Sequence, residues 1–148
     1  FSMTDEVKYF TGGTHISPIV TPIGKLGVVI CYDLRFPEIS RKLTVEGAEV
    51  LIVPSQFPHP REHHWDTLLR SRAIENQVFV IGVNRVGGRN PSFFGHSMVI
   101  DPYGTMLDQL GNKEDVLVCE IDLSRLHEVR KAMPVLLDRK PELYNEKE

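Results

Sequence analysis

The stretch Lys25-Leu-Gly-Val-Val-Ile-Cys31-Tyr-Asp-Leu-Arg-Phe-Pro-Glu38 decides the fold of this 148-residue chain. Its apolar, β-branched run 26–30 predicts a buried strand. Pro37 and Glu38 favour the first turn of a helix, because the N–H that proline lacks has no partner there and a carboxylate suits the helix dipole. A strand–turn–helix junction of this kind presents one side chain at its tip. That side chain is Cys31, which is therefore the candidate nucleophile.

Helical and extended patterns alternate on both sides of this stretch. We expect a short extended piece at 7–10, strands at 19–21, 50–53, 78–83, 96–100, 105–107 and 116–121, and helices at 38–46, 63–77 and about 124–131. The strand–helix–strand order implies neighbouring parallel strands. Asp101-Pro-Tyr-Gly104 predicts the turn of an antiparallel hairpin. The sequence therefore predicts an α/β fold with parallel strands first and antiparallel strands later.

Composition excludes several classes of protein. A net charge of -3 gives no electrostatic reason to expect nucleic acid as a partner. No apolar run approaches the roughly 20 residues that cross a bilayer, and the first residues do not resemble a signal peptide. Two cysteines are too few for a disulfide scaffold, so we expect a reducing, cytoplasmic setting. The sequence shows neither a metal-ligand spacing nor a glycine-rich phosphate loop, and we expect no metal and no cofactor.

Five blocks, in order, resemble the carbon–nitrogen hydrolase (nitrilase) superfamily and within it the Nit and ω-amidase-like branch. They are Asp5–Phe10, Cys31–Glu38, Gly47–Pro54, Arg70–Gln77 and Gly95–Gly104. The resemblance implies a four-layer αββα sandwich, of which this chain supplies part. It also implies that residues 1–148 are the C-terminal portion of a single domain, with 133–148 as a C-terminal arm.

The resemblance further implies the hydrolysis of a small amide through a cysteine thioester, with release of ammonia. Cys31 would be the nucleophile, the Tyr32 backbone N–H an oxyanion donor and Glu6 an accessory active-site glutamate. The family's glutamate base and lysine belong to segments that precede the Glu6 block. We therefore expect the chain alone to be inactive and to need the missing N-terminal part of the same enzyme. A homo-oligomer formed through helices 38–46 and 63–77 is also expected.

Four residues are candidates for binding the substrate. The Arg35 guanidinium, close to the nucleophile, suits a substrate carboxylate. Gln56 and Phe57 follow the strand 50–53, and Asn84, with Arg85 beside it, ends the strand 78–83. Ligand sites of parallel sheets form at these carboxyl ends. We expect Arg70, Arg72 and Glu75, in contrast, to form a structural ion-pair network on one helix.

Other functions remain open at this stage. Within the enzyme class, the chain could belong to a nitrilase or an N-carbamoyl amidohydrolase. It could also be a non-catalytic fragment that serves only as a structural or interaction module. A third reading makes Cys31 a redox-sensing thiol.

Overall fold

A six-stranded mixed sheet forms the centre of the computed structural model, which describes residues 3–144, with side chains from residue 6 onward. In the order of the sheet, its strands are β1 (Ile19–Thr21), β2 (Gly24–Val28), β3 (Val50–Ser55), β4 (Phe79–Asn84), β7 (Met98–Ile100) and β8 (Met106–Gln109). Strands β2, β3 and β4 are parallel, and the other pairs are antiparallel. The predicted class and the predicted hairpin of β7 and β8 are confirmed.

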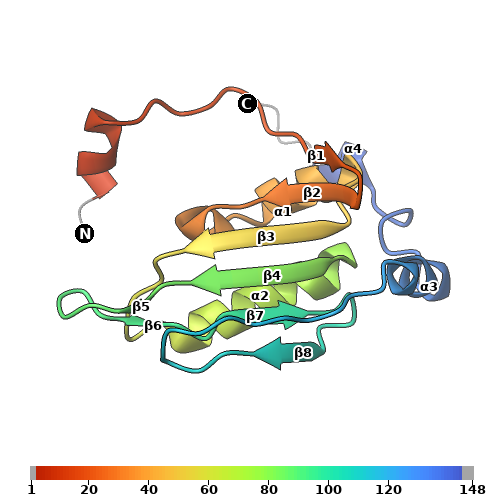
Figure 1. Ribbon diagram of the computed structural model, residues 1–148. Coiled ribbons are helices and arrows are strands. Elements are labelled where there is room, and N and C mark those ends of the chain that lie inside the picture. The colour runs from red at the N-terminus through yellow and green to blue at the C-terminus, as the bar shows by residue number, and fades with distance from the viewer. Residues whose placement is uncertain (1–2, 145–148) are drawn as a thin grey trace.

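Two helices connect the parallel strands and lie on one face of the sheet (Figure 1). Helix α1 (Pro37–Val45) joins β2 to β3, and α2 (Glu62–Asn76) joins β3 to β4. Pro37 occupies the first turn of α1, as its missing N–H favours. The remaining helical segments are the 3₁₀ helices η1 (Met3–Lys8) and η2 (Cys31–Arg35), and the α-helices α3 (Ser124–Ala132) and α4 (Pro141–Tyr144). The predicted helices end within two residues of these bounds.

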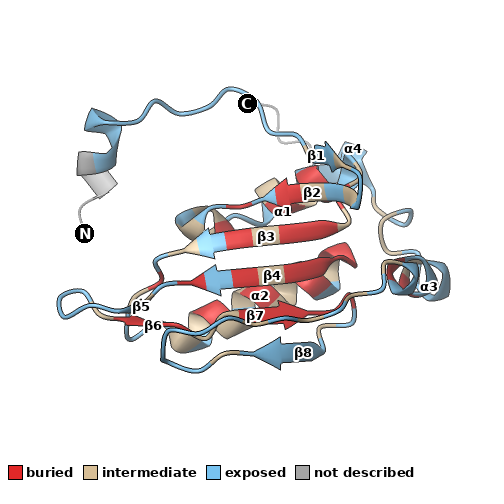
Figure 2. Cartoon of the chain, viewed as in Figure 1, coloured by how far each residue is buried: buried red, intermediate tan, exposed pale blue. Residues whose placement is uncertain are grey.

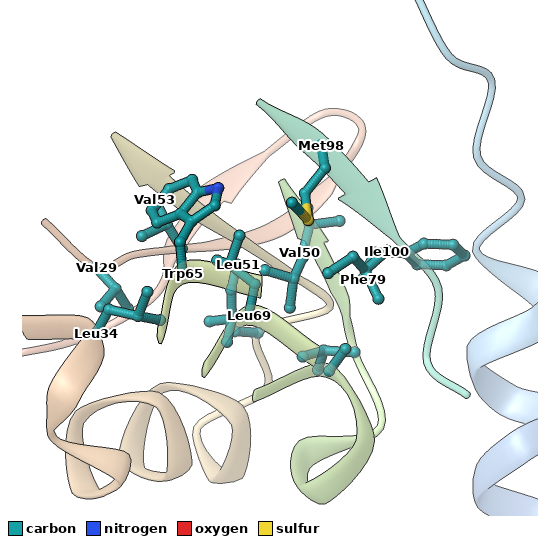
Figure 3. Close-up of a cluster of buried hydrophobic side chains, with 14 of the residues drawn as sticks. Val29, Leu34, Val50, Leu51, Val53, Trp65, Leu69, Phe79, Met98 and Ile100 are labelled. Carbon is teal, nitrogen blue, oxygen red and sulfur yellow. The ribbon is translucent and has the colours of Figure 1, made fainter. Parts of the chain in front are cut away.

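Glycines allow the sheet to approach its helices closely. A Cβ on Gly82 would lie 2.5 Å from Leu69 Cδ1 and 2.7 Å from Trp65 Cζ2, both on α2. A Cβ on Gly27 would lie 3.2 Å from Leu43 Cδ1, on α1. Figure 3 shows Trp65 and Leu69 within the buried cluster that fills this layer. The sheet and the two helices therefore share one close-packed core.

The opposite face of the sheet is apolar and partly exposed. Cross-strand pairing aligns Val28, Ile52, Ile81 and Val99 in one row on that face. Val28 is 39% exposed, and Val83, farther along β4, is 49% exposed. Figure 2 shows the exposure increasing toward the carboxyl ends of β3 and β4. The αββα sandwich that the resemblance implies would cover such a face with a second sheet.

Two strand predictions were wrong. Residues 116–121 form no strand, and Val116 and Val118 are 80% and 88% exposed, because the described chain offers this run no neighbouring strand. The piece around Val7–Phe10 is not extended either. The N–H groups of Tyr9 and Phe10 both donate to the Glu6 carbonyl oxygen at 3.0 Å, which closes a local turn instead.

The sequence also missed one small hairpin. Within the polar loop that follows β4, strands β5 (Val86–Gly87) and β6 (Phe93–Phe94) pair with each other. The expected C-terminal arm contains α4, and its residues 145–148 lie outside the described part of the chain.

Candidate active site

Cys31 lies at the tip of the junction that the sequence predicted. Beyond the end of β2, the Val29 N–H still donates to the Ile52 carbonyl oxygen at 3.0 Å, and η2 begins at Cys31. Cys31 has a φ of 46°, in the left-handed region that side chains other than glycine rarely adopt. Such strain persists only where the surrounding structure imposes it, and it concentrates at functional sites. The backbone conformation therefore identifies Cys31 as a candidate functional residue, independently of the chemistry of its thiol.

Arg72 of α2 holds the turn that carries Cys31. Its Nη2 donates to the Leu34 carbonyl oxygen at 2.7 Å, and its Nη1 pairs with Glu75 at 2.9 Å. The Arg72 side chain is only 5% exposed, and Leu34 is fully buried. The predicted ion pair of Arg72 with Glu75 is confirmed, whereas Arg70 pairs with Asp66. The link from α2 to η2 has no signal in the sequence.

A cavity of about 1240 Å³ lies at the carboxyl ends of β2, β3 and β4. The structure brings all the sequence-predicted site residues to its wall, namely Glu6, Cys31, Tyr32, Arg35, Gln56, Phe57 and Asn84. Glu6 arrives on η1, at the end of a long extended segment (Figure 1). Tyr32 is the second residue of η2, so its N–H belongs to the first turn, where a helix leaves donors without intrahelical acceptors. The roles of these residues stay predictions.

Arg35 is held at the cavity wall by an aromatic ring. Its Cζ lies 5.2 Å from the ring centroid of Phe57, which is a cation–π distance. Phe57 is itself buried and packs against Trp65, with 5.4 Å between the ring centroids. Among the described side chains, no carboxylate lies within ion-pair distance of Arg35. Arg35 therefore offers a positioned, uncompensated positive charge to whatever occupies the cavity.

Asn84 fixes the backbone of Phe57. Its Oδ1 accepts the Phe57 N–H at 2.7 Å, and its Nδ2 donates to the Phe57 carbonyl oxygen at 3.2 Å and to the Gly95 carbonyl oxygen at 2.9 Å. Both amide donors of the buried Asn84 side chain are thereby occupied. The sequence predicted a substrate contact for this residue. The contacts in the structure instead position Phe57, and a direct substrate contact remains untested.

A second guanidinium, on Arg85, lines the same cavity. The Arg85 Cζ lies 4.7 Å from the ring centroid of Phe93, and its Nη1 donates to Gln56 Oε1 at 3.1 Å. Gln56 and Arg85 therefore form one hydrogen-bonded pair at the ends of β3 and β4.

His64 near this site has a lowered pKa. Burial is the largest cause of this lowered pKa, and the positive charges of His63, Arg35 and Arg61 add to it. The His64 Nδ1 is buried without a hydrogen-bond partner among the described residues. Neutral imidazole is therefore the favoured form of this side chain.

Residues 3–144 offer neither a metal-binding cluster nor a membrane-spanning helix. No group of three or more His, Cys, Asp and Glu side chains is placed there to hold a metal ion. None of the helices in this range is long and apolar enough to span a bilayer.

Two amidases share much of this sequence. The chain is 44% identical over 136 residues to a deaminated glutathione amidase of Mus musculus, covering 90% of this chain and 42% of that protein. It is 43% identical over 146 residues to a 2-oxoglutaramate amidase of Bacillus subtilis, covering 97% and 56%. The chain thus spans about half the length of these relatives.

Solved structures share the fold. A carbon–nitrogen hydrolase from Helicobacter pylori G27 superposes with a TM-score of 0.90 at 37% identity, covering 95% of this chain and 55% of that one. An amidase from Nesterenkonia sp. AN1, with the acetamide moiety of fluoroacetamide covalently added at its active-site cysteine, gives 0.79 at 29% identity, covering 95% and 51%. The nitrilase-type fold is therefore confirmed, whereas the assignment to the C-terminal portion of the domain stays a prediction.

The family model for carbon–nitrogen hydrolases matches residues 2–131, which is most of the chain and includes the Cys31 junction and the three parallel strands. The residues from 132 onward lie outside the match. The chain therefore belongs to the carbon–nitrogen hydrolase family.

Proposed function

We propose that this chain carries the nucleophile of an amidase that hydrolyses an ω-amide of a small dicarboxylic acid. The Cys31 thiolate attacks the amide carbon, the C–N bond breaks, and the leaving nitrogen takes up a proton and departs as ammonia. Water then displaces Sγ from the thioester and returns the acid and the thiol. The Tyr32 N–H stabilises the oxyanion, and Glu6 orients the amide. The observation that carries this proposal is the left-handed backbone of Cys31 at the cavity wall.

Charge and relatives support this substrate class. Arg35, held on Phe57, supplies a positive charge for a substrate carboxylate, and Gln56 lines the same cavity. Asn84 contributes through Phe57. Two relatives are named as amidases of 2-oxoglutaramate and of deaminated glutathione. An amide that also bears a carboxylate satisfies both Cys31 and Arg35.

The chain alone is proposed to be inactive. The family mechanism needs a glutamate base and a lysine, and no lysine is among the described residues that line the cavity. A further segment of the same enzyme would supply both groups. The cytoplasmic setting is proposed on the small number of cysteines, and the homo-oligomer on the family resemblance alone.

The test joins this chain to the N-terminal segment of the Bacillus subtilis relative, as one polypeptide. Glutaramate, 4-cyanobutyrate and the corresponding N-carbamoyl compound are compared as substrates, and released ammonia is measured. We expect ammonia from glutaramate, none after Cys31→Ala, and none from the chain alone. Hydroxylamine should trap the thioester as a hydroxamate. A folded chimera that releases no ammonia from any of the three would favour a non-catalytic module, and sulfenic acid at Cys31 without substrate would favour a redox sensor.

A further inference from the structure

Arg85 lies across the cavity from the nucleophile. Cys31 follows β2 and Arg85 follows β4, and β3 lies between these two parallel strands. Two strand spacings separate the backbones of Cys31 and Arg85, which amounts to about 10 Å. Arg35, in contrast, belongs to the same short helix as Cys31. Of the three guanidinium groups that line the cavity, on Arg35, Arg61 and Arg85, Arg35 therefore lies near the nucleophile in the chain and Arg85 lies two strands away from it.

Two contacts hold the Arg85 guanidinium in place. Phe93 lies beneath it at 4.7 Å, and Gln56 Oε1 accepts one of its N–H groups at 3.1 Å. Phe93 is 6% exposed and is fixed on both sides, since β6 pairs with β5 and Phe93 also bridges to Pro58. A guanidinium held in this way loses little side-chain freedom when an anion binds.

The charge of Arg85 is uncompensated within the described residues. No carboxylate lies within ion-pair distance of it. A guanidinium has five N–H donors, and Gln56 occupies one. The remaining donors suit a carboxylate, which accepts two parallel hydrogen bonds and carries one negative charge.

We propose that Arg85, with Gln56, forms a distal carboxylate subsite that selects amide substrates by length. This inference rests on the proposed amidase function. A short ω-amide reaches Arg35 alone, whereas a longer substrate places its terminal carboxylate on Arg85. Arg85 is thus a specificity-determining residue, and it acts on binding rather than on the chemistry at Cys31.

A protection experiment on the chain itself tests the subsite without any turnover. Iodoacetamide alkylates the thiols, and peptide mass spectrometry follows Cys31 in the presence of glutarate or suberate. Suberate has an extended span that approaches the separation of the subsite from the nucleophile. We expect it to protect Cys31 at concentrations about tenfold lower than glutarate does, the factor that a charge-assisted hydrogen bond provides. Cys119, outside the cavity, is the internal control and should react equally with either diacid.

Three variants test whether Arg85 causes the advantage of suberate over glutarate. Arg85→Gln should abolish the advantage of suberate and leave protection by glutarate unchanged, whereas Arg85→Lys should keep part of the advantage. Arg61→Gln removes a charge from the same cavity wall and should change neither the protection by suberate nor the protection by glutarate. Equal protection by both diacids in the unaltered chain would overturn the subsite. An equal loss in Arg61→Gln and Arg85→Gln would also overturn it, since only a diffuse positive field would then be acting.

Turnover by the chimera separates this inference from the function on which it rests. Hydrolysis of glutaramate and of the monoamide of suberate with equal efficiency, unchanged by Arg85→Gln, would refute the subsite and leave the amidase intact. Length-dependent protection without hydrolysis of either amide would refute the amidase and leave the carboxylate subsite standing.

Discussion

The side-chain amide of Asn84 pairs with both backbone groups of Phe57, accepting its N–H at 2.7 Å and donating to its carbonyl oxygen at 3.2 Å. The two residues come from the ends of neighbouring parallel strands. The pairing fixes the backbone from which the Phe57 ring projects, and that ring carries the Arg35 guanidinium. One amide thus determines where a positive charge lies in the cavity.

Replacing Asn84 with alanine should destabilise the chain. The buried N–H and carbonyl groups that lose their partners cost about 1–3 kcal/mol each, so the urea midpoint should fall clearly. Asn84→Asp keeps the acceptor for the Phe57 N–H and loses both donors, so an intermediate loss is expected. The exposed Asn112→Ala is the matched control. In the chimera, Asn84→Asp should raise KM more than it lowers kcat, and an unchanged KM would contradict the link to Arg35.

Glycine should fit the backbone at position 31 better than alanine does. Cys31→Ala retains a side chain at a φ of 46°, whereas Cys31→Gly relieves the strain. Relief of a left-handed non-glycine residue is worth about 1 kcal/mol, so Cys31→Gly should unfold at a higher urea concentration than Cys31→Ala. In the chimera, both variants should lack hydrolytic activity. Equal midpoints would indicate that the turn is not strained.

Arg72→Leu should loosen the turn that bears the nucleophile. The substitution removes the donor of the buried Leu34 carbonyl oxygen, and hydrogen bonds to charged groups contribute about 1.5–3 kcal/mol. Urea unfolding should report a loss of that order. Arg70→Leu, on the same helix and bonded to the half-buried Asp66 and to the Gly104 carbonyl oxygen, is the comparison. Hydrogen exchange should increase in η2 for Arg72→Leu only, and protection that stays the same there would contradict the role.

His64 should make the stability of the chain fall in mild acid. Its folded pKa lies below the ordinary value of 6.5, mainly because the ring is partly buried. As the pH falls, His64 therefore takes up a proton in the unfolded chain before it does so in the folded chain. The contribution of His64 to the stability of the fold is complete above about pH 6.5 and is lost as the pH falls toward the folded pKa. His64→Gln should flatten the dependence of the urea midpoint on pH in this window. The exposed His127→Gln is the control substitution. An identical pH profile for His64→Gln would refute the assignment.

The core of the fold could be predicted because the strongest apolar patterns in the sequence belong to buried strands. The runs at 50–53 and 78–83 are continuous and apolar, and both became central strands. Residues 116–121 carry a similar pattern and form no strand, because a strand also needs a neighbour to accept its hydrogen bonds. Strands β5 and β6, which pair with each other, are too short to produce a periodic signal.

The candidate site was predictable in its position and not in its internal contacts. Residues that follow parallel strands meet at one edge, so Cys31, Gln56 and Asn84 were expected together, and they line one cavity. No pattern shows that the Asn84 amide is occupied by the backbone, or that Arg72 reaches the Leu34 carbonyl oxygen. Such contacts join side chains to distant main-chain atoms, and residue spacing carries no information about them.

The meeting of three strand ends at one cavity has an evolutionary consequence. The conformation of Cys31 depends on η2 and on Arg72, whereas the walls come from the loops after β3 and β4. Mutations in those loops can alter which acid is accepted while the nucleophile keeps its geometry. In the proposed amidase, selectivity and reactivity are therefore separable traits. Lineages that share the nucleophile turn are free to diverge in the substrate that they accept.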